Sequence, residues 1–517
     1  MANSKQNPDQ AEAIRADDIE TLHKMGYAQE LLRSMNGFSN FAISFSIICI
    51  LAGGITSLQL GISSVGGAAI GLGWPLSCFF SMLVALAMGQ VASAFPTAGG
   101  LYHWGSILGG KGWGWITAWF NLVGLVTVLS AINVGTYLFI IGALGSLYDF
   151  KLESLGANGA FALQAVCVLA ITVTQAILNH RGIRLTSRLT DLSGYLIFAI
   201  SLLLTVALFV VAKHIDFSRL WTFTNYSGPA GADIWPKTDN LLYLFLLSIL
   251  LPAYTVTGFD ASAHTAEETT NAALNVPRGM VRAVLWSGLF GWIMLVAIVV
   301  AIPDMDQGAA QGGNVFYWLM DSVMPKGLKT FLYVGIAVAQ YLCGLATLTS
   351  ASRMFYAFAR DGGLPCSAKL KSVSARFRTP AAAIWTAGAL SAAFTLYTPV
   401  YSTITVICVI FLYVSYVIPI ALGFFAYGKG WTRMGPWTIG RWYRPVALLC
   451  VLGCGLIIYV GIQPPNHKAL GIVVVSLVAA GVIWFGYERK RFQGPPAGLL
   501  SQKRDAEVRD TSLPLVD

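Results

Sequence analysis

Charged residues are scarce in this chain. Only 11% of its 517 residues are Asp, Glu, Lys or Arg, whereas 56% are hydrophobic and the mean hydropathy is +0.65. An ordinary soluble domain carries about 25% charged residues. This composition therefore excludes a typical soluble enzyme and indicates a chain that folds in lipid.

Cysteine frameworks and catalytic motifs are also missing. Seven of the eight cysteines lie within apolar runs, and neither a disulfide framework nor a zinc-binding spacing is visible. The sequence contains no His-Glu-x-x-His and no Gly-x-Ser-x-Gly, which mark metalloproteases and serine hydrolases. We therefore expect no enzyme activity, no metal and no cofactor.

Apolar runs long enough to cross a bilayer recur along the chain. A transmembrane helix needs a run of about 18 residues or more, and twelve runs meet this length. They lie near residues 38–60, 73–94, 115–145, 160–178, 191–212, 240–262, 280–302, 329–355, 380–397, 402–426, 445–462 and 467–487. The pattern predicts an all-α integral membrane protein with 12 transmembrane helices, surrounded by the lipid bilayer.

Basic residues predict the orientation of these helices. With the N-terminus placed in the cytoplasm, 26 of the 33 Lys and Arg fall on the cytoplasmic side. This asymmetry satisfies the positive-inside rule and predicts that both termini are cytoplasmic, with the cell membrane as the location. The net charge of +9 follows from this topology, and we expect no nucleic-acid partner.

Two of the apolar runs are interrupted near their middle. Residues Ala52-Gly53-Gly54-Ile55-Thr56 interrupt the first run, and Thr255-Val256-Thr257-Gly258-Phe259-Asp260 interrupt the sixth. Unwound backbone in hydrocarbon must line a cavity or hold a ligand, because its polar groups cannot stay unpaired. Matching breaks in successive halves are typical of secondary transporters built as inverted repeats. Close helix packing is the alternative interpretation of Gly53 and Gly54.

Asp260 is a carboxylate inside the predicted bilayer, with no Lys or Arg near it in the sequence. Such a residue is functional by default. Asp260 could carry a proton or neutralise a cationic head group, and the structural alternative is an acceptor at the restarted helix. His264 follows one helical turn later and could share a proton with Asp260, although it also fits an ordinary histidine at a helix end.

Glu267 and Glu268 lie near the predicted cytoplasmic end of the sixth run. Arg353, Arg278 or Arg282 could pair with them and hold an inner gate closed. A solvated charge cluster is the alternative.

Polar side chains inside other runs could face a cavity. They are Asn121, Asn133, Gln340, Tyr413 and Tyr416. Asn133 is the preferred substrate-binding candidate, because an amide in hydrocarbon needs partners and a substrate could be one. Hydrogen bonding between helices is the more common use of such an amide.

Three segments carry a resemblance to a known superfamily. They are Pro96 to Trp104 after the second run, Glu267-Glu268-Thr269 with Asn271 and Val276-Pro277-Arg278 after the sixth, and Ser352 to Pro365 after the eighth. These segments resemble the loop motifs of the amino acid, polyamine and organocation transporter superfamily. Gly26 to Arg33 and Phe259 to His264 are most similar to its amino acid and choline transporter family, which includes permeases for 4-aminobutyrate, choline and amino acids.

The resemblance implies a five-plus-five inverted repeat of the leucine transporter type. The repeats would be residues 38–212 and 240–426, followed by two added helices in 445–487, between tails 1–37 and 488–517. Ala52, Gly53, Gly54 and Ile55 would bind a substrate carboxylate, with free N–H groups at the last three. Carbonyls around Tyr254, Thr255 and Thr257 would receive an ammonium group, and Gly258 would let the backbone come close.

The resemblance also bears on ion coupling. Relatives that replace sodium with a lysine carry it in the fifth span, but residues 192–212 contain none. Sodium-coupled relatives carry a Ser or Thr pair in the eighth span, where this chain has Leu342 and Cys343. Oxygens of Thr347, Thr349 and Ser350 nearer the cytoplasm are the alternative sodium ligands. We therefore expect proton symport or exchange of a small amine-bearing solute by alternating access, with an amino acid or 4-aminobutyrate preferred. A choline or polyamine permease and a non-transporting nutrient sensor are the alternatives, and the oligomeric state is left open.

Overall fold

The computed structural model describes residues 8–397 and 401–496. Every regular element in these two ranges is a helix. Ten helical segments there are long and apolar enough to cross a membrane. The helices that form them are α2 (Gly37–Ile48) with α3 (Ile50–Thr56), α5 (Trp74–Ala94), α7 (Lys111–Tyr148), α8 (Gly156–His180), α9 (Ile183–Val211), α13 (Ala272–Ala301), α16 (Lys326–Arg360), α19 (Tyr401–Ala426), α20 (Tyr443–Gly461) and α21 (His467–Ile483).

The other two predicted spans coincide with shorter apolar helices. One is α10 (Leu241–Ser248) continued by α11 (Leu250–Thr255), and the other is α18 (Ala381–Tyr397). Each of the twelve predicted runs thus has a helix at its position. The number of membrane crossings stays a prediction, because these two helices are shorter than a bilayer requires.

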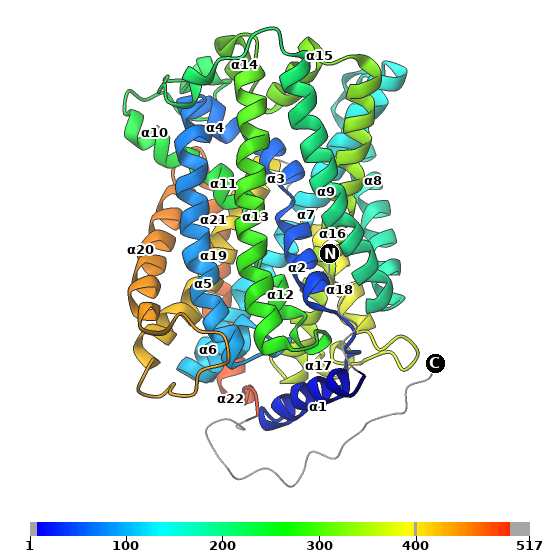
Figure 1. The fold of residues 1–517 in the computed structure, drawn as a ribbon, viewed down its shortest axis with the longest axis vertical. Coiled ribbons are helices and arrows are strands. Elements are labelled where there is room, and N and C mark those ends of the chain that lie inside the picture. The colour runs from blue at the N-terminus through cyan, green and yellow to red at the C-terminus, as the bar shows by residue number, and fades with distance from the viewer. Residues whose placement is uncertain (1–7, 398–400, 497–517) are drawn as a thin grey trace.

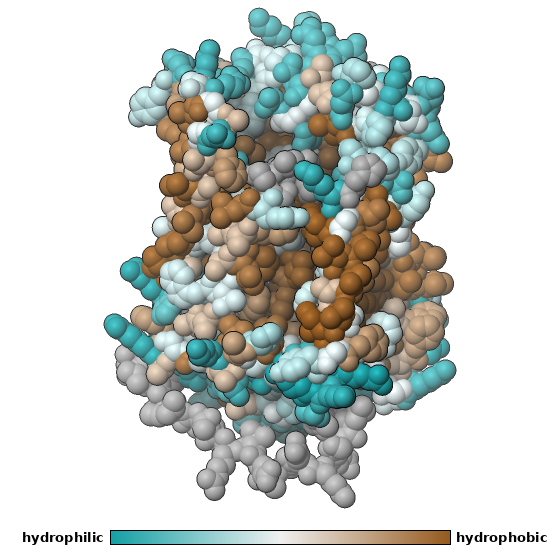
Figure 2. All heavy atoms as spheres, turned by 180° about the vertical axis from the view of Figure 1, so that it is seen from behind, coloured by the Kyte–Doolittle hydropathy of each residue, from teal (hydrophilic) through white to brown (hydrophobic). Residues whose placement is uncertain are grey.

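The long helices run side by side along the long axis of the molecule (Figure 1). Short helices cap the bundle at both ends. At one end lie α4 (Leu58–Val65), α14 (Met305–Ala310) and α15 (Val315–Val323), and at the other lie α1 (Pro8–Lys24), α6 (Leu101–Gly109), α17 (Ser367–Leu370) and α22 (Arg489–Arg491). We call these the α4 end and the α1 end. Hydrophilic side chains gather at both ends, and a hydrophobic surface separates them (Figure 2), as a membrane-spanning protein requires.

The helices divide into an inner and an outer set. The most apolar stretch of α2 and α3 is 94% buried, and α7 packs between α16 and α19 in the interior. The corresponding stretch that contains α21 is only 17% buried. Apolar residues on the outer helices therefore meet lipid, whereas the inner helices enclose any internal site.

The sequence did not indicate the helix α1. Its residue Asp18 accepts hydrogen bonds from the backbone N–H groups of Asn271 (2.6 Å) and Ala272 (3.0 Å), at the start of α13. Burial raises the pKa of the Asp18 carboxyl, although Arg33 and these two donors favour its charged form. Because the cap joins α1 to α13, the described part of the N-terminal tail belongs to the folded structure. The predicted tail 488–517 is described only as far as residue 496.

Candidate functional site

The first apolar run is interrupted at Cys49, upstream of the predicted position. The helix α2 ends at Ile48, Cys49 has a φ of +28°, and α3 begins at Ile50. The prediction of a break at residues 52–56 is therefore wrong, because these residues form the body of α3. Nothing in the composition marks Cys49, since a positive φ at a residue other than glycine has no sequence signal.

Gly53 and Gly54 lie within the helix α3, and Gly53 serves packing. The Gly53 N–H donates to the carbonyl of Cys49 (2.9 Å), so it is not free as predicted. Gly54 and Ile55 lie further inside α3, where helical geometry pairs each N–H with a carbonyl four residues earlier. A Cβ on Gly53 would lie 3.1 Å from the Thr255 side chain. The absence of a side chain thus lets α3 approach α11.

The sixth run is interrupted where the sequence predicted. Residues 256–260 are not helical, and α12 (Ala261–His264) begins after them. Gly258 has a φ of +83°, and an added Cβ there would collide with the Ile47 side chain. Only glycine combines this backbone conformation with this close approach. Its N–H donates to the hydroxyl of Tyr416 (3.0 Å), so the unwound backbone is anchored to α19.

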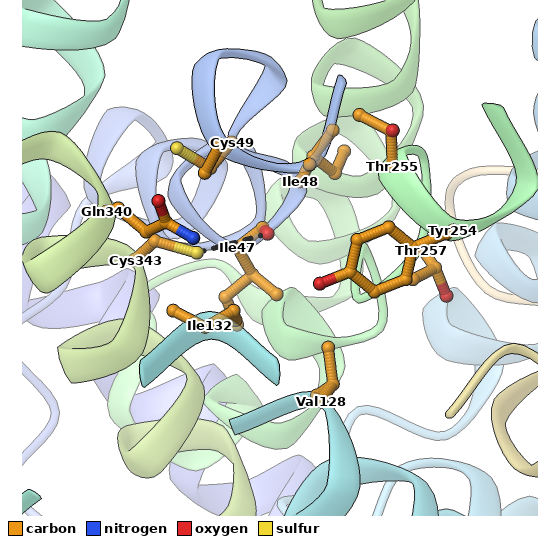
Figure 3. Close-up of a pocket in the computed structure, with 12 residues that line it drawn as sticks. Ile47, Ile48, Cys49, Val128, Ile132, Tyr254, Thr255, Thr257, Gln340 and Cys343 are labelled. Atoms are coloured by element: carbon orange, nitrogen blue, oxygen red, sulfur yellow. Dashed lines mark hydrogen bonds between the residues drawn. The ribbon is translucent and has the colours of Figure 1, made fainter. Parts of the chain in front are cut away.

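An enclosed cavity lies between the two interruptions (Figure 3). Its free volume is about 10 Å³, which is room for one water-sized molecule, so the site is closed in this arrangement. The lining residues are Ile47, Ile48, Cys49, Ala52, Gly53, Val128, Ile132, Tyr254, Thr255, Thr257, Gln340 and Cys343. Figure 3 shows Cys49, Gln340 and Cys343 on one side of this cavity and Tyr254, Thr255 and Thr257 on the other. None of the twelve is charged.

The structure therefore brings together five of the predicted substrate-binding residues. Ala52, Gly53, Tyr254, Thr255 and Thr257 line the cavity. Gly54, Ile55 and Gly258 lie beside it within the two interrupted segments, but they are not among the lining residues.

Asn133 takes no part in the cavity wall. Its amide nitrogen donates to the Thr172 hydroxyl (3.0 Å), and its amide oxygen accepts from Gln175 (3.0 Å). Both partners lie on α8, so Asn133 joins α7 to α8. Its preferred assignment as a substrate-binding residue is not supported, because other side chains satisfy its hydrogen bonds.

Asp260 is completely buried at the end of the interruption in the sixth run. Its Oδ1 accepts from the hydroxyl of Tyr416 (2.7 Å). Its Oδ2 accepts from the amide of Asn121 (3.1 Å) and lies 3.1 Å from Nε2 of His264. The structure thus brings the two predicted proton-coupling residues together, and Asn121 and Tyr416 face Asp260 instead of the cavity.

Hydrogen bonds connect the cavity region to the α1 end. The Tyr416 hydroxyl, which binds Asp260, also contacts the hydroxyl of Thr257 (3.3 Å) in the cavity wall. Nδ1 of His264 lies 3.4 Å from the carbonyl oxygen of Ala98, and the Ala98 N–H donates to the carboxylate of Glu267 (3.1 Å). Asp260 and His264 therefore lie between the cavity and the acidic residues at the α1 end.

Two buried ion pairs close the α1 end. Arg353 binds Glu268 through two hydrogen bonds of 2.9 Å, and both side chains are completely buried. Arg360 binds Glu267 through two hydrogen bonds of 3.0 and 3.1 Å. The sequence interpretation missed Arg360, although it lies seven residues after Arg353 on the same helical face. The other suggested partners, Arg278 and Arg282, are exposed.

The N-terminal segment reinforces this closure. The backbone N–H groups of Ser34 and Met35 donate to the carbonyl of Glu268 (2.9 and 2.8 Å). The Tyr27 hydroxyl donates to Asp361 (2.7 Å), and the Arg360 guanidinium lies 3.8 Å from the centre of the Tyr27 ring. Burial raises the pKa of the Asp361 carboxyl, which the neighbouring Arg360 partly offsets.

These features define a class of protein. An enclosed cavity between two interrupted membrane helices, closed at one end by buried ion pairs, is the arrangement of a membrane transport protein. The family model for amino acid permeases matches residues 35–486 of this chain. The chain therefore belongs to the amino acid permease family, which confirms the resemblance in the loop motifs, and it is a permease and not an enzyme.

Individual relatives agree with this family. The chain is 32% identical to the amino-acid permease BAT1 of Arabidopsis thaliana, over 93% of this chain and 96% of that protein. It is 34% identical to the BAT1 homolog of Oryza sativa subsp. japonica, over 92% and 95% of the two chains. It is 27% identical to the GABA-specific permease of Saccharomyces cerevisiae, over 96% and 90%. The similarity extends over nearly the whole chain in each case.

Proposed function

We propose that this permease moves net-neutral amino acids, including 4-aminobutyrate, across the cell membrane by alternating access. Residues 38–212 and 240–426 form the two inverted repeats in this proposal, with 12 membrane crossings and both termini in the cytoplasm. The solute binds between the interruptions at Cys49 and at residues 256–260. The α1 end is then the cytoplasmic side, and its two ion pairs form the closed inner gate.

The proposal of proton coupling rests on a proton held between Asp260 and His264. The Ala98 carbonyl oxygen can only accept, so Nδ1 of His264 bears a hydrogen. The bond between Nε2 and Asp260 then needs a second hydrogen, on either the ring or the carboxyl group. The pair thus holds one exchangeable proton in the closed arrangement.

The position of this proton links it to the cavity on one side and to the gate on the other. Tyr416 joins Asp260 to the backbone of Gly258, beside the cavity. Ala98 joins His264 to Glu267 of the gate. Loss of the proton would leave the Nε2 lone pair facing a carboxylate at 3.1 Å, which is repulsive. Proton release therefore favours separation of the residues that keep the site closed.

Two further contacts favour a mechanism without sodium. The thiol of Cys343 donates to the carbonyl oxygen of Ile47 (3.3 Å), next to the first interruption. The hydroxyl of Thr347 donates to the Cys343 carbonyl (2.9 Å). These donors take up part of the hydrogen-bonding capacity of two oxygens that could serve as ligands for a hard cation.

The lining of the cavity supports an amino acid over choline or a polyamine. Those solutes carry net positive charge, and no lining residue is an anion. Asp260 is the nearby carboxylate, but its oxygens are bonded to Asn121, His264 and Tyr416. A zwitterion brings its own opposite charge and needs no such counter-ion.

Uptake into sodium-free liposomes tests the proposal. Purified protein is offered 4-aminobutyrate, leucine, arginine, choline or putrescine, with and without an inward proton gradient. We expect the gradient to drive accumulation of a net-neutral amino acid. Counterflow without accumulation would indicate an exchanger, and no flux of any solute would favour a non-transporting sensor.

The variant Asp260→Asn tests the coupling step. We expect it to keep counterflow but to lose gradient-driven accumulation, because an amide at this position cannot bind and release the coupling proton. Asp191→Asn is the matched control, because Asp191 is a half-buried carboxylate bonded to Ser39 and lies away from the cavity. Acid-stimulated accumulation retained in Asp260→Asn would place the coupling proton elsewhere.

A further inference from the structure

Gln340 is a buried amide whose hydrogen bonds are unmade. It lies on α16, its side chain is about 1% exposed, and it lines the cavity between the two interruptions. Neither its amide nitrogen nor its amide oxygen has a hydrogen-bond partner among the residues that the structure describes. Leaving both atoms unpaired in a closed interior costs free energy, so this side chain needs an explanation.

The surrounding helices are shaped to admit this amide. A Cβ on Gly135 of α7 would collide with the Gln340 amide nitrogen, so the absence of a side chain there makes room for it. Figure 3 shows the amide beside Ile47 and Cys343 at the cavity wall. The nearby amide of Asn133 is satisfied on both atoms by Thr172 and Gln175. Hydrogen bonding between helices therefore explains why Asn133 is buried, but it does not explain why Gln340 is.

The chemistry of the amide indicates what it recognises. An amide nitrogen donates and an amide oxygen accepts, so one group satisfies both only if it can accept and donate. A hydroxyl or a carboxamide does so, whereas a carboxylate only accepts and an ammonium only donates. A charged side chain would also enter a cavity without a counter-charge among its lining residues.

We propose that Gln340 is a specificity-determining residue that binds the side-chain hydroxyl or carboxamide of a net-neutral amino acid. This inference rests on the proposed function, because it names the substrate class of the same cavity. The backbone at the two interruptions binds the ammonium and carboxylate groups that all amino acids share, and Gln340 distinguishes polar from apolar side chains.

Competition between solutes of nearly equal shape tests this inference. Threonine is compared with valine, and asparagine with leucine, in the sodium-free liposomes. We expect the wild-type protein to prefer the polar member of each pair by about 5- to 150-fold in relative uptake efficiency, the range for one buried polar contact. Gln340→Met should lower threonine uptake much more than valine uptake, and its thermal unfolding temperature in detergent shows that the variant is folded. Gln175→Met is the matched control, because Gln175 binds Asn133 and Tyr341 outside the cavity.

A binding measurement separates this inference from the proposed function. Cys343 lines the same cavity, so a bound solute should slow its modification by a thiol reagent, as followed by mass spectrometry. Protection by threonine but not valine, lost in Gln340→Met, would support the inference even if no flux occurred and the transport proposal failed. Equal uptake and equal protection for threonine and valine, unchanged in Gln340→Met, would overturn the inference while transport itself stood. Absence of protection by any solute would overturn it too.

Discussion

Asp260 is surrounded by donors from three helices. Asn121 comes from α7, His264 from α12 and Tyr416 from α19. A completely buried carboxylate loses its hydration, and such donors must replace it. Because the donors belong to different helices, movement of any one of these helices would change the hydrogen bonds that Asp260 accepts. The proposed proton coupling rests on this arrangement.

Tyr416→Phe should move the pH dependence of uptake. The lost hydroxyl donates to the charged form of Asp260, so its removal makes proton release harder. We expect the pH of half-maximal uptake to rise by about one to two units, since a hydrogen bond to a charged group contributes about 1.5–3 kcal/mol. Uptake is measured in liposomes at a series of external pH values. Tyr413→Phe is the control, because Tyr413 binds Ser81. An unchanged profile would contradict the role of the pair.

The two interrupted helices differ in how they are broken. The first is broken at the single residue Cys49, and the second at five residues, 256–260. At Gly258 the second break packs against the side chain of Ile47, two residues before the first break. The packing of the two interrupted helices against each other thus depends on Gly258, which has no Cβ and adopts a positive φ.

Gly258→Ala should damage both folding and transport. Its positive φ costs an alanine roughly 1–2 kcal/mol, and the new Cβ collides with Ile47. We expect a lower thermal unfolding temperature in detergent and uptake reduced by about 10-fold or more. Gly54→Ala is the control, because its Cβ would meet Leu295 at an ordinary 3.5 Å. Normal uptake by Gly258→Ala would remove this interruption from the mechanism.

The whole molecule is closed at the α1 end by contacts between distant segments. The N-terminal segment, the region after α12 and the end of α16 meet there through Arg33, Glu268 and Arg353. Arg33 donates to the Ala266 carbonyl (3.1 Å), and Arg353 pairs with Glu268. In the proposed transport cycle, opening this end would break the buried ion pair between Arg353 and Glu268.

Glu268→Gln should weaken this closure. The change leaves Arg353 buried without its anion, and loss of one partner of a buried pair costs about 3–5 kcal/mol. We expect a lower unfolding temperature and faster modification of Cys343 by a thiol reagent, because the closed state is disfavoured. Glu20→Gln is the control, since Glu20 forms an exposed pair with Lys24. A slower reaction at Cys343 would show that this ion pair does not hold the site closed.

The length of the apolar runs and the chemistry of individual residues were enough to predict much of the fold and part of the candidate site. The apolar runs predicted the positions of the ten long apolar helical segments in the described residues, because lipid demands continuous hydrophobic helices. The interruption at residues 256–260 was predictable, because Gly258, Thr257 and Asp260 are poor residues for the middle of a membrane helix. Asp260 with His264, and Glu267 with Glu268, were also identifiable, because charge within or near an apolar run is costly.

Tertiary structure alone decided the rest. Cys49 is apolar and yet interrupts its helix, whereas Gly53 and Gly54 are helical, and Gly53 lets α3 approach α11. Asn133 and Gln340 are both buried amides, and only their neighbours show that the first joins helices while the second lines the cavity. Sequence determines which groups need partners, because solvation is a property of each residue. The fold determines which partners they find, because these come from helices far apart in the chain.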